Sequence, residues 1–280
     1  MQTINQTATV DFLVFFLDNE GNLIFKEQFL MKSRESKTHF GYQTVSTQEK
    51  QTKVNEVFSR VANKYDLMND LMSLGVHHFW KWFAIHIAMV RPHHKILDLA
   101  GGSGDLSLLM AKKFYPNIEI VLADINANML AQGRNRLLDA GFVKNIEFVQ
   151  VNAESLPFEE RLFDTTFMAF GLRNVTNQDN ALKELWRVTK PGGKICILEF
   201  SKPTSASLKY LYDWYSFHVI PKLGEWFAQD AASYEYLVES IRMHPDQETL
   251  KKMILNAGFD DCKVVNLTGG IVALHIAHRY

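Results

Sequence analysis

A glycine-rich loop between two carboxylates is the part of the chain whose residue types most clearly suggest chemistry. In "LDLAGGSGDLS", Leu97 to Ser107, a short apolar run leads through the loop into a helical pattern. The loop glycines are Gly101, Gly102 and Gly104. Glycine lets a backbone approach a ligand closely, and a strand, a glycine loop and a helix in that order are typical of nucleotide-binding sites. The flanking carboxylates Asp98 and Asp105 bear on which nucleotide is bound.

The two carboxylates favour S-adenosylmethionine over a dinucleotide. A dinucleotide fingerprint reads G-x-G-x-x-G, and here Ser107 stands at the third glycine position. A carboxylate also repels a pyrophosphate in a site of reduced dielectric. S-adenosylmethionine has no phosphate and carries an ammonium and a sulfonium, so it tolerates Asp98 and Asp105. The alternative is that Asp98 packs at a strand end and Asp105 caps the helix.

Further candidates for the cofactor site follow the next two strand-like runs. Asp124 ends "IVLAD", about 20 positions after the glycine loop, where a carboxylate accepts hydrogen bonds from ribose hydroxyls. Asn152 and Ala153 follow the third run at the same expected sheet edge, where a side chain and a backbone amide can contact adenine. Asn152 alone is equally consistent with a turn residue.

Arg173 is the candidate for catalysis. It lies in "AFGLRNV", after a fourth apolar run and over the expected cofactor site. A cation near an acceptor oxygen favours the ionised form of that oxygen. We therefore interpret Arg173, assisted by Asn174, as a donor to an acceptor oxyanion. The alternative is a solvated or salt-bridged arginine.

The elements that must position these residues alternate along the chain. Strand-like runs are expected at 95–100, 118–125, 146–153, 163–171, 193–200, 262–268 and 271–279. Helical patterns are expected at 54–74, 78–90, 105–114, 127–141, 178–190 and 246–259. Such alternation predicts right-handed βαβ units and an α/β fold with a mostly parallel sheet. The last two runs, joined by "GG", should pair antiparallel.

The first fifty residues differ from the rest. "DFLVFFLDNEGNLIFKEQFL" predicts two strands joined by a turn at "DNEGN", and the polar stretch 32–51 reads as a loop or tail. We therefore expect an extension over 1–50 and one domain over 51–280. Met31 is a candidate natural start, and an endogenous peptide from residues 1–30 in mass spectrometry would refute it.

The composition excludes several classes. The chain has 280 residues with a formal net charge of -1, 47% hydrophobic and 22% charged residues, so it lacks the basic excess of a nucleic-acid-binding protein. No run reaches the ~20 apolar residues of a membrane span. The two cysteines, Cys196 and Cys262, lie in apolar runs and indicate buried thiols in a reducing compartment. The histidine pairs at 77–78 and 93–94 lack H-E-x-x-H spacing, so no metal is predicted.

Several longer motifs add a family resemblance. They are "KYDLMNDLMSLGVHHFWKW", "LDLAGGSGDL", "FGLRNVT", "RVTKPGGKICILEFSKP", "YSFHVIPKLG" and "ESIRMHPDQETLKKM". Together they strongly resemble the bacterial UbiE/Coq5 family of ubiquinone/menaquinone biosynthesis C-methyltransferases. The match runs from about Thr38 to the C-terminus, and the first thirty residues have no counterpart in it.

The resemblance implies a class I S-adenosylmethionine-dependent methyltransferase fold, Rossmann-like, with a seven-stranded sheet of which one strand is antiparallel. It implies methylation of a ring carbon on 2-methoxy-6-polyprenyl-1,4-benzoquinol, on demethylmenaquinol or on both; another small aromatic acceptor is the alternative. The family's cofactor contacts carry over to Ser103, Asp124, Asn152, Ala153 and Ala169. Three residues depart from the commonest pattern: Ser103 replaces threonine, Ala169 replaces serine and His78 replaces arginine.

Further residues are candidates to face the quinol. Tyr65 is a catalytic candidate, while Asp66 and His218 are weaker substrate candidates. The insertion 201–244 holds nine aromatic residues, which suits a lid with an apolar slot, a membrane-docking surface or an ordinary helical cap. We expect a cytoplasmic protein, peripheral on the inner face of the cytoplasmic membrane. Contacts with other quinone-biosynthesis enzymes and a homodimer are further expectations, although the sequence leaves the oligomeric state open.

Three rival functions remain to be weighed. A Rossmann oxidoreductase is disfavoured by Ser107 and Asp98, and titration with NAD and with S-adenosylmethionine would separate the two. A nucleic-acid amino-methyltransferase would carry an N/D-P-P-Y/F run where "FGLRN" stands. A scaffold without activity is disfavoured by the intact Asp98, glycine loop, Asp124 and Arg173.

Overall fold

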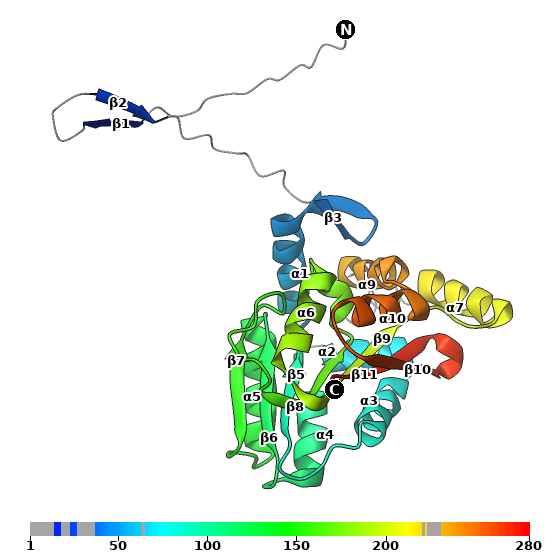
Figure 1. Ribbon diagram of the computed structural model, residues 1–280. Coiled ribbons are helices and arrows are strands. Elements are labelled where there is room, and N and C mark those ends of the chain that lie inside the picture. Colours follow the sequence, from blue (N-terminus) through cyan, green and yellow to red (C-terminus); the bar gives the residue numbers. More distant parts are fainter. Residues whose placement is uncertain (1–13, 18–22, 27–36, 63–64, 220–221, 223–230) are drawn as a thin grey trace. The chain divides into compact units, whose positions relative to one another are not determined.

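The chain divides into two compact units, Met1–Ser36 and Lys37–Tyr280. The computed structural model describes residues 14–17, 23–26, 37–62, 65–219, 222 and 231–280 (Figure 1). In the first unit, β1 (Val14–Leu17) pairs antiparallel with β2 (Leu23–Lys26), as expected. The expected turn at 18–22 and the candidate start Met31 lie outside the described residues.

The second unit is built on a seven-stranded sheet. Its strands are β5 (Lys95–Leu99), β6 (Glu119–Asp124), β7 (Ile146–Gln150), β8 (Phe163–Ala169), β9 (Thr189–Phe200), β10 (Asp261–Leu267) and β11 (Val272–His278). The strand order is β10-β11-β9-β8-β5-β6-β7, and β11 runs antiparallel to both of its neighbours. The expected mostly parallel sheet, with the last two strands paired antiparallel, is therefore confirmed.

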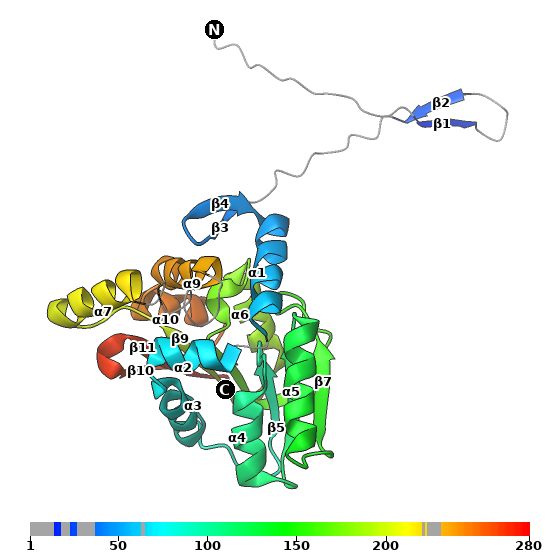
Figure 2. The same cartoon turned by 180° about the vertical axis from the view of Figure 1, so that it is seen from behind.

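Helices cover both faces of this sheet (Figures 1 and 2). On one face, α3 (Val76–Ile87), α4 (Asp105–Phe114) and α5 (Ala127–Asp139) bury apolar side chains against strand residues such as Ile96 and Leu122. On the other face, α6 (Gln178–Val188) and α10 (Gln247–Asn256) pack against residues such as Leu97 and Leu99. Successive residues of a strand point to opposite faces, so the continuous apolar run of β5 serves both cores.

A further group of helices packs together outside these layers. It comprises α1 (Thr47–Val61), α2 (Tyr65–Ser73) and α9 (Ala231–Met243), which share a buried apolar cluster that includes Val61, Met68 and Tyr234. The insertion also contributes α7 (Ala206–His218). Trp226 and Phe227, two of its predicted aromatic residues, lie outside the described residues.

The polar stretch 32–51 is not a loop from Lys37 onward. Residues Lys37–Phe40 (β3) and Gln43–Ser46 (β4) form an antiparallel hairpin, and α1 begins directly afterwards. Ser46 caps that helix, because its Oγ accepts a hydrogen bond from the Glu49 N–H at 3.2 Å, the first half of an S-x-x-E capping box. Phe40 of the hairpin stacks on Tyr236 of α9 at 4.1 Å. These tertiary contacts place the division between the units at 36/37 rather than at 50/51.

The "PGG" motif, residues 191–193, is not the connection that the expected helix 178–190 and the expected strand 193–200 leave between them. It lies inside β9, which begins at Thr189, directly after the last residue of α6. The pairing of β8 with β9 is irregular there, because Phe163 pairs with Thr189 whereas Thr165 pairs with Lys194. An irregularity of this kind absorbs the extra residues without ending the strand.

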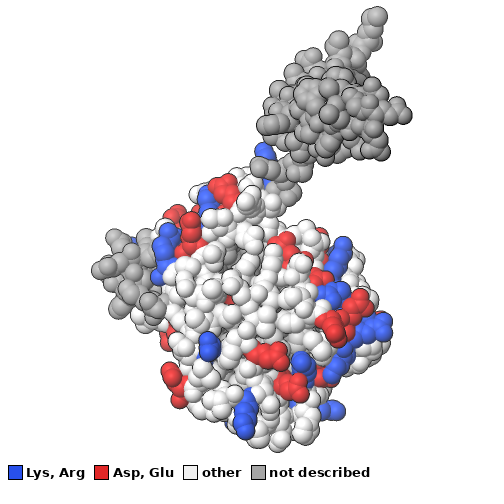
Figure 3. Space-filling model, turned by 90° about the vertical axis from the view of Figure 1, so that its left-hand side faces the viewer, with Lys and Arg blue, Asp and Glu red and all other residues white. Residues whose placement is uncertain are grey.

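Two surface properties complete the description. In the part of the chain that the structure describes, every helix falls short of the length and apolar character needed to cross a membrane. On the face drawn in Figure 3, acidic and basic side chains of the described residues are interspersed rather than gathered into one basic tract.

Candidate active site

The loop after β5 folds back against the end of β6. Gly101 N–H donates to the carbonyl of Ala123 at 3.2 Å, and Gly102 and Gly104 have φ angles of 55° and 78°. A Cβ at Gly101 would lie 2.3 Å from a methyl carbon of Leu122 and 2.8 Å from the carboxyl carbon of Asp98. Only glycine therefore fits at Gly101, and positive φ favours glycine at the other two positions.

Asp98 is fully buried beside this loop and keeps one oxygen without a partner. Its Oδ2 accepts hydrogen bonds from the N–H and the Oγ of Ser107, at 3.1 and 2.7 Å, whereas Oδ1 has no hydrogen-bond partner among the described residues. Burial raises the pKa of Asp98 to about 6, against the opposing hydrogen bonds from Ser107. A buried acceptor with a free oxygen calls for a donor, and a cationic one stabilises it best.

Asp124 occupies the corresponding position at the end of β6. Its Oδ2 accepts from Gly102 N–H at 2.9 Å, its Oδ1 accepts from Asn126 N–H at 2.8 Å, and burial raises its pKa to about 6. Each oxygen retains a second lone pair. The carboxylate thus holds the glycine loop and can still accept hydrogen bonds from a ligand.

Two cavities open beside these carboxylates. The smaller one, about 320 Å³, is lined by Lys81, Asp98, Ala100, Gly101, Ser103, Asp105, Leu106, Ala169 and Phe170. Lys81 Nζ lies 2.6 Å from Asp105 Oδ2 and is almost fully buried. A cation and an anionic oxygen therefore line the same small space, which is complementary to the zwitterionic head of an amino acid.

The larger cavity, about 800 Å³, lies between α1 and the ends of the strands. Its walls include Phe58, Gly102, Asp124, Met129, Asn152, Ala153, Gly171 and Asn174. Helix α1 is fixed at this place by Lys50, whose Nζ donates to the carbonyl of Val175 at 2.9 Å and whose pKa is lowered by burial to about 8. Asn152 Oδ1 accepts from Glu154 N–H at 3.0 Å, so it is a turn residue that also lines the cavity.

The candidate cofactor residues are thus brought together by the structure. Gly102, Asp124, Asn152 and Ala153 line the larger cavity, and Asp98, Gly101, Ser103 and Ala169 line the smaller one. Gly104 lies outside both linings and instead forms the left-handed residue at which α4 begins. Asp105 also lines the smaller cavity and pairs with Lys81 and with Arg136. The alternative interpretation of Asp105 as only a helix cap does not account for these contacts.

Arg173 is buried and paired with a carboxylate. Its Nη1 donates to Glu199 Oε1 at 2.8 Å, and both side chains are nearly inaccessible to solvent. The alternative interpretation, a salt-bridged arginine, is therefore correct for Nη1 of the guanidinium. The interpretation of Arg173 as a donor to an acceptor oxyanion no longer applies to that nitrogen. The Nε atom is buried, and the part of the chain that the structure describes provides no hydrogen-bond partner for it. Arg173 thus still has donor capacity to offer.

Two further side chains surround this ion pair. Tyr236 of α9 donates from its hydroxyl to Asn174 Oδ1 at 3.0 Å. His244 is 3% exposed, and neither of its ring nitrogens has a hydrogen-bond partner within the described ranges. The charges of Arg173 and Glu199 both act on its imidazole. Burial lowers the pKa of His244 to about 4, so its imidazole is neutral at physiological pH.

The remaining candidates have different outcomes. Tyr65 begins α2, but its side chain lies outside the described part of the chain. Asp66 accepts a hydrogen bond from Ser103 Oγ at 3.1 Å and pairs with Arg136, which places it beside the smaller cavity. His218 is exposed at the end of α7, with its Nδ1 3.0 Å from the carbonyl of Trp214. That side chain is held by its own helix, so the structure gives no support for His218 as a substrate residue.

Sequence reasoning missed Lys81, Gly133, Glu199 and His244. Lys81 interrupts the apolar helix "FWKWF", and Glu199 is a lone acid near the end of the apolar strand "KICILEF". Gly133 is an isolated glycine within α5, where a Cβ would lie 2.8 Å from the carbonyl oxygen of Gly102. A charge or a glycine inside an otherwise regular pattern is the signal that could have found Lys81, Gly133 and Glu199.

Comparison with known proteins assigns the chain to a family. The model of the ubiE/COQ5 methyltransferase family matches residues 46–279. The chain is 58% identical over 250 residues to the ubiquinone/menaquinone biosynthesis C-methyltransferase UbiE of Legionella pneumophila (strain Paris), covering 89% of this chain and 100% of that protein. It is 56% identical, with the same coverage, to the protein of that name from Coxiella burnetii (strain Dugway 5J108-111).

Solved structures support the fold. A SAM-dependent methyltransferase from Aquifex aeolicus superimposes with a TM-score of 0.53 at 17% identity, over 70% of this chain and 88% of that one. A SAM-dependent methyltransferase from Thermotoga maritima gives 0.55 at 18% identity, over 80% and 99%. The sheet order is that of the class I methyltransferase fold, and the family match covers most of the chain. The chain therefore belongs to the ubiE/COQ5 methyltransferase family.

Proposed function

We propose that the two cavities hold S-adenosylmethionine so that its methyl group is transferred to a ring carbon of a prenylated quinol. The acceptor is 2-methoxy-6-polyprenyl-1,4-benzoquinol, demethylmenaquinol or both. The observation that carries this proposal is the fully buried Asp98 with its unpartnered Oδ1 beside the glycine loop. The Oδ1 atom does not contribute to the hydrogen bonds of the sheet, and it suits a cationic ammonium group.

The residues present fit the methyl donor. Asp98 and Lys81 line the smaller cavity and would take the ammonium and the carboxylate of the methionine part. Asp124 would accept hydrogen bonds from the ribose hydroxyls, and Asn152 with Ala153 would contact the adenine. When bound, S-adenosylmethionine supplies an already activated methyl group. The protein mainly orients the two partners and excludes water, which alone removes a large part of the barrier.

Arg173 and its neighbours would prepare the acceptor. The buried guanidinium lies next to Phe170, which lines both cavities, and Asn174 lines the larger one. A cation beside a phenol favours the phenolate, which places electron density on the adjacent ring carbon. Glu199 holds Arg173 through two hydrogen bonds, to Nη1 and to the backbone N–H. We assign Glu199 a positioning role; the residue that removes the ring proton stays open.

A turnover assay tests the proposal. The purified protein is given methyl-labelled donor with each of the two quinols, and methylated product is measured for wild type and Arg173→Ala. We expect transfer to at least one quinol and a large loss of turnover in the variant, with donor affinity retained. Unchanged turnover in Arg173→Ala would remove this residue from the mechanism, and transfer to neither quinol would contradict the acceptor class.

Helix α7 supports the expected membrane association. It exposes Tyr210, Leu211, Trp214 and Phe217, of which Tyr210 is 77% and Leu211 59% exposed. Large apolar side chains clustered on one helix are unfavourable in water and bind the interface of a bilayer without crossing it. Such a surface would also receive a tailed quinol from the membrane.

Vesicle sedimentation tests this association. Wild type should pellet with vesicles made of neutral and anionic phospholipid, and the double variant Leu211→Ser/Trp214→Ser should stay in the supernatant. Val143→Ser, which removes an equally exposed apolar side chain elsewhere, is the matched control and should pellet. Equal pelleting of the double variant and the control would refute α7 as the docking surface.

A further inference from the structure

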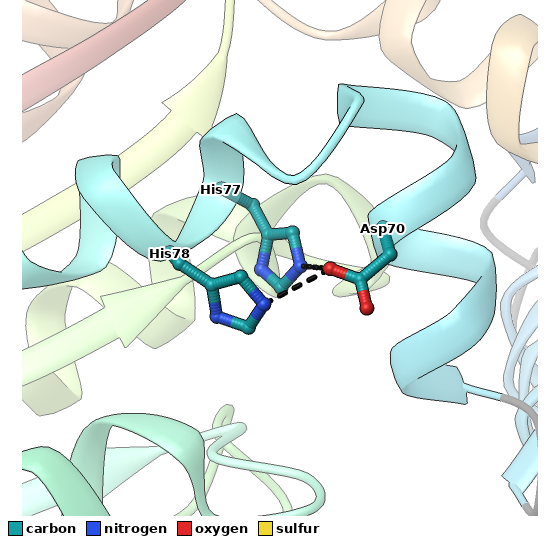
Figure 4. A group of neighbouring side chains, drawn as sticks. All are labelled: Asp70, His77 and His78. Carbon is teal, nitrogen blue, oxygen red and sulfur yellow. Dashed lines mark hydrogen bonds and ion pairs between the residues drawn. The ribbon is translucent and has the colours of Figure 1, made fainter.

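A group of three potential metal ligands lies at the turn between α2 and α3 (Figure 4), and none of the three lines either cavity described above. Asp70 comes from α2, and His77 and His78 come from the first turn of α3. Both imidazoles point their Nε2 atoms at the same oxygen, Asp70 Oδ1, at 2.8 Å for His77 and 2.9 Å for His78. The three ligand atoms, one from each side chain, all lie within 4.8 Å of one another.

The turn that creates this convergence is well defined. Leu74 and Gly75 have positive φ angles of 51° and 76°, and Gly75 N–H donates to the carbonyl of Asp70 at 2.9 Å. The chain therefore reverses directly after α2 and brings His77 back to Asp70. The N–H of His77 also donates a hydrogen bond to Ser73 Oγ at 3.2 Å. The backbone thus fixes the ligand positions without help from an ion.

We propose that Asp70, His77 and His78 bind a divalent transition-metal ion of the zinc class, through Nε2 of each histidine and Oδ1 of the aspartate. Zinc bonds to imidazole nitrogen and carboxylate oxygen are about 2.0–2.2 Å, so tetrahedral ligand atoms are about 3.3 Å apart. The observed separations of 2.8 and 2.9 Å need only a small opening. On binding, each imidazole proton moves from Nε2 to Nδ1 and the nitrogen lone pair is donated to the ion.

The three side chains differ in solvent exposure in a way that suits such an ion. His77 is held rigidly, with 4% of its side chain exposed, whereas Asp70 and His78 are 45% and 61% exposed. The remaining coordination positions therefore face solvent. Lys81 lies on the same helix as the two histidines and pairs with Asp105, Nζ to Oδ2 at 2.6 Å, which limits its repulsion of a second cation.

The ligand set also selects the class of ion. Two of the three ligands are imidazole nitrogens, which suit zinc, nickel and copper, whereas magnesium and calcium require oxygen ligands. An ion here would join α2 to α3. Lys81 of α3 and its partner Asp105 line the smaller cavity, and Asp66 of α2 accepts a hydrogen bond from Ser103, which also lines it. The site is independent of the identity of the methyl acceptor.

Direct binding tests the proposal. Tag-free protein, treated with chelator and dialysed, is titrated with zinc by calorimetry and with cobalt by visible absorption, which reports nitrogen and oxygen ligation. We expect one ion per chain and a rise in unfolding temperature. His78→Gln and Asp70→Asn should each weaken binding at least about tenfold, since a lost ligand costs no less than a lost outer-shell partner. Magnesium should give no signal.

The control is His86→Gln, which removes an exposed histidine of the same helix that lies outside the group. It should bind the ion as wild type does. Circular dichroism of each variant checks that the fold is kept. Equal affinity in His78→Gln and His86→Gln would place the ion elsewhere and overturn the proposal, as would the absence of any binding at millimolar zinc.

Discussion

Replacing Asp98 by asparagine should separate the two effects of its buried charge. Asparagine keeps an oxygen that accepts the two hydrogen bonds from Ser107, but it puts an NH₂ where the carboxylate has its unpartnered Oδ1. The side chain thus keeps its shape and its anchor and loses its charge. A donor in place of an acceptor no longer stabilises the ammonium of S-adenosylmethionine.

The magnitude follows from burial and from the lost ionic hydrogen bond. A hydrogen bond to a charged group contributes about 1.5–3 kcal/mol, so the Kd for S-adenosylmethionine should rise about 10- to 100-fold.

The same substitution should increase the stability of the ligand-free protein. The folded pKa of Asp98 is raised from 3.8 to about 6, so about 3 kcal/mol of stability is present below pH 3.8 and is lost as pH rises through 6. Asparagine does not titrate, so the ligand-free variant should escape that loss.

Isothermal titration and urea unfolding measure both effects at neutral pH. The matched control is Asp164→Asn, which alters a carboxylate at the start of β8, bound to Lys95 N–H and Lys190, and should leave Kd unchanged. The affinity of wild type should fall as pH drops through about 6, and the profile of Asp98→Asn should be shallower but not flat, because Asp124 titrates in the same range. Wild-type affinity in Asp98→Asn would refute the reasoning.

Two further predictions concern the supports of the site. Glu199→Gln leaves Arg173 buried without a counter-charge, so the free energy of unfolding should fall by about 3–5 kcal/mol, and an unchanged urea midpoint would contradict the pairing. Gly133→Ala places a methyl group 2.8 Å from the carbonyl oxygen of Gly102, so the glycine loop must shift. Affinity for S-adenosylmethionine should drop with the circular dichroism spectrum retained; an unaltered Kd would show that the loop tolerates the shift.

The parts of the fold that depend on local pattern were predictable from the sequence. Helix α4 begins at Asp105 and ends at Phe114, as its apolar spacing indicates, and β5 lies within the expected run 95–100. Asp98 and Asp124 could be identified because a carboxylate at the end of a buried strand reaches the ligand edge of a parallel sheet. In each case the signal lies within a few residues of the feature.

Features that need distant segments were not predictable. The roof over the larger cavity is α1, whose packing depends on contacts with α9 such as Val54 and Val57 beside Tyr236. The pairing of Arg173 with Glu199 depends on the register of two strands. Ala169, the last residue of β8, lies opposite Leu198 of β9, so the segment after β8, which contains Arg173, begins beside Glu199. Lys81 reaches Asp105 only because α3 packs beside α4. No local periodicity encodes these distances.

The position of the transferred methyl group tests the central claim most directly. The product formed from isotopically methyl-labelled S-adenosylmethionine and each quinol is isolated and analysed by nuclear magnetic resonance. A labelled methyl bonded to a ring carbon, with both hydroxyls intact, is the result that the proposed C-methyltransferase activity predicts. A label on a quinol oxygen, or no transfer to either quinol by the folded protein, would contradict it.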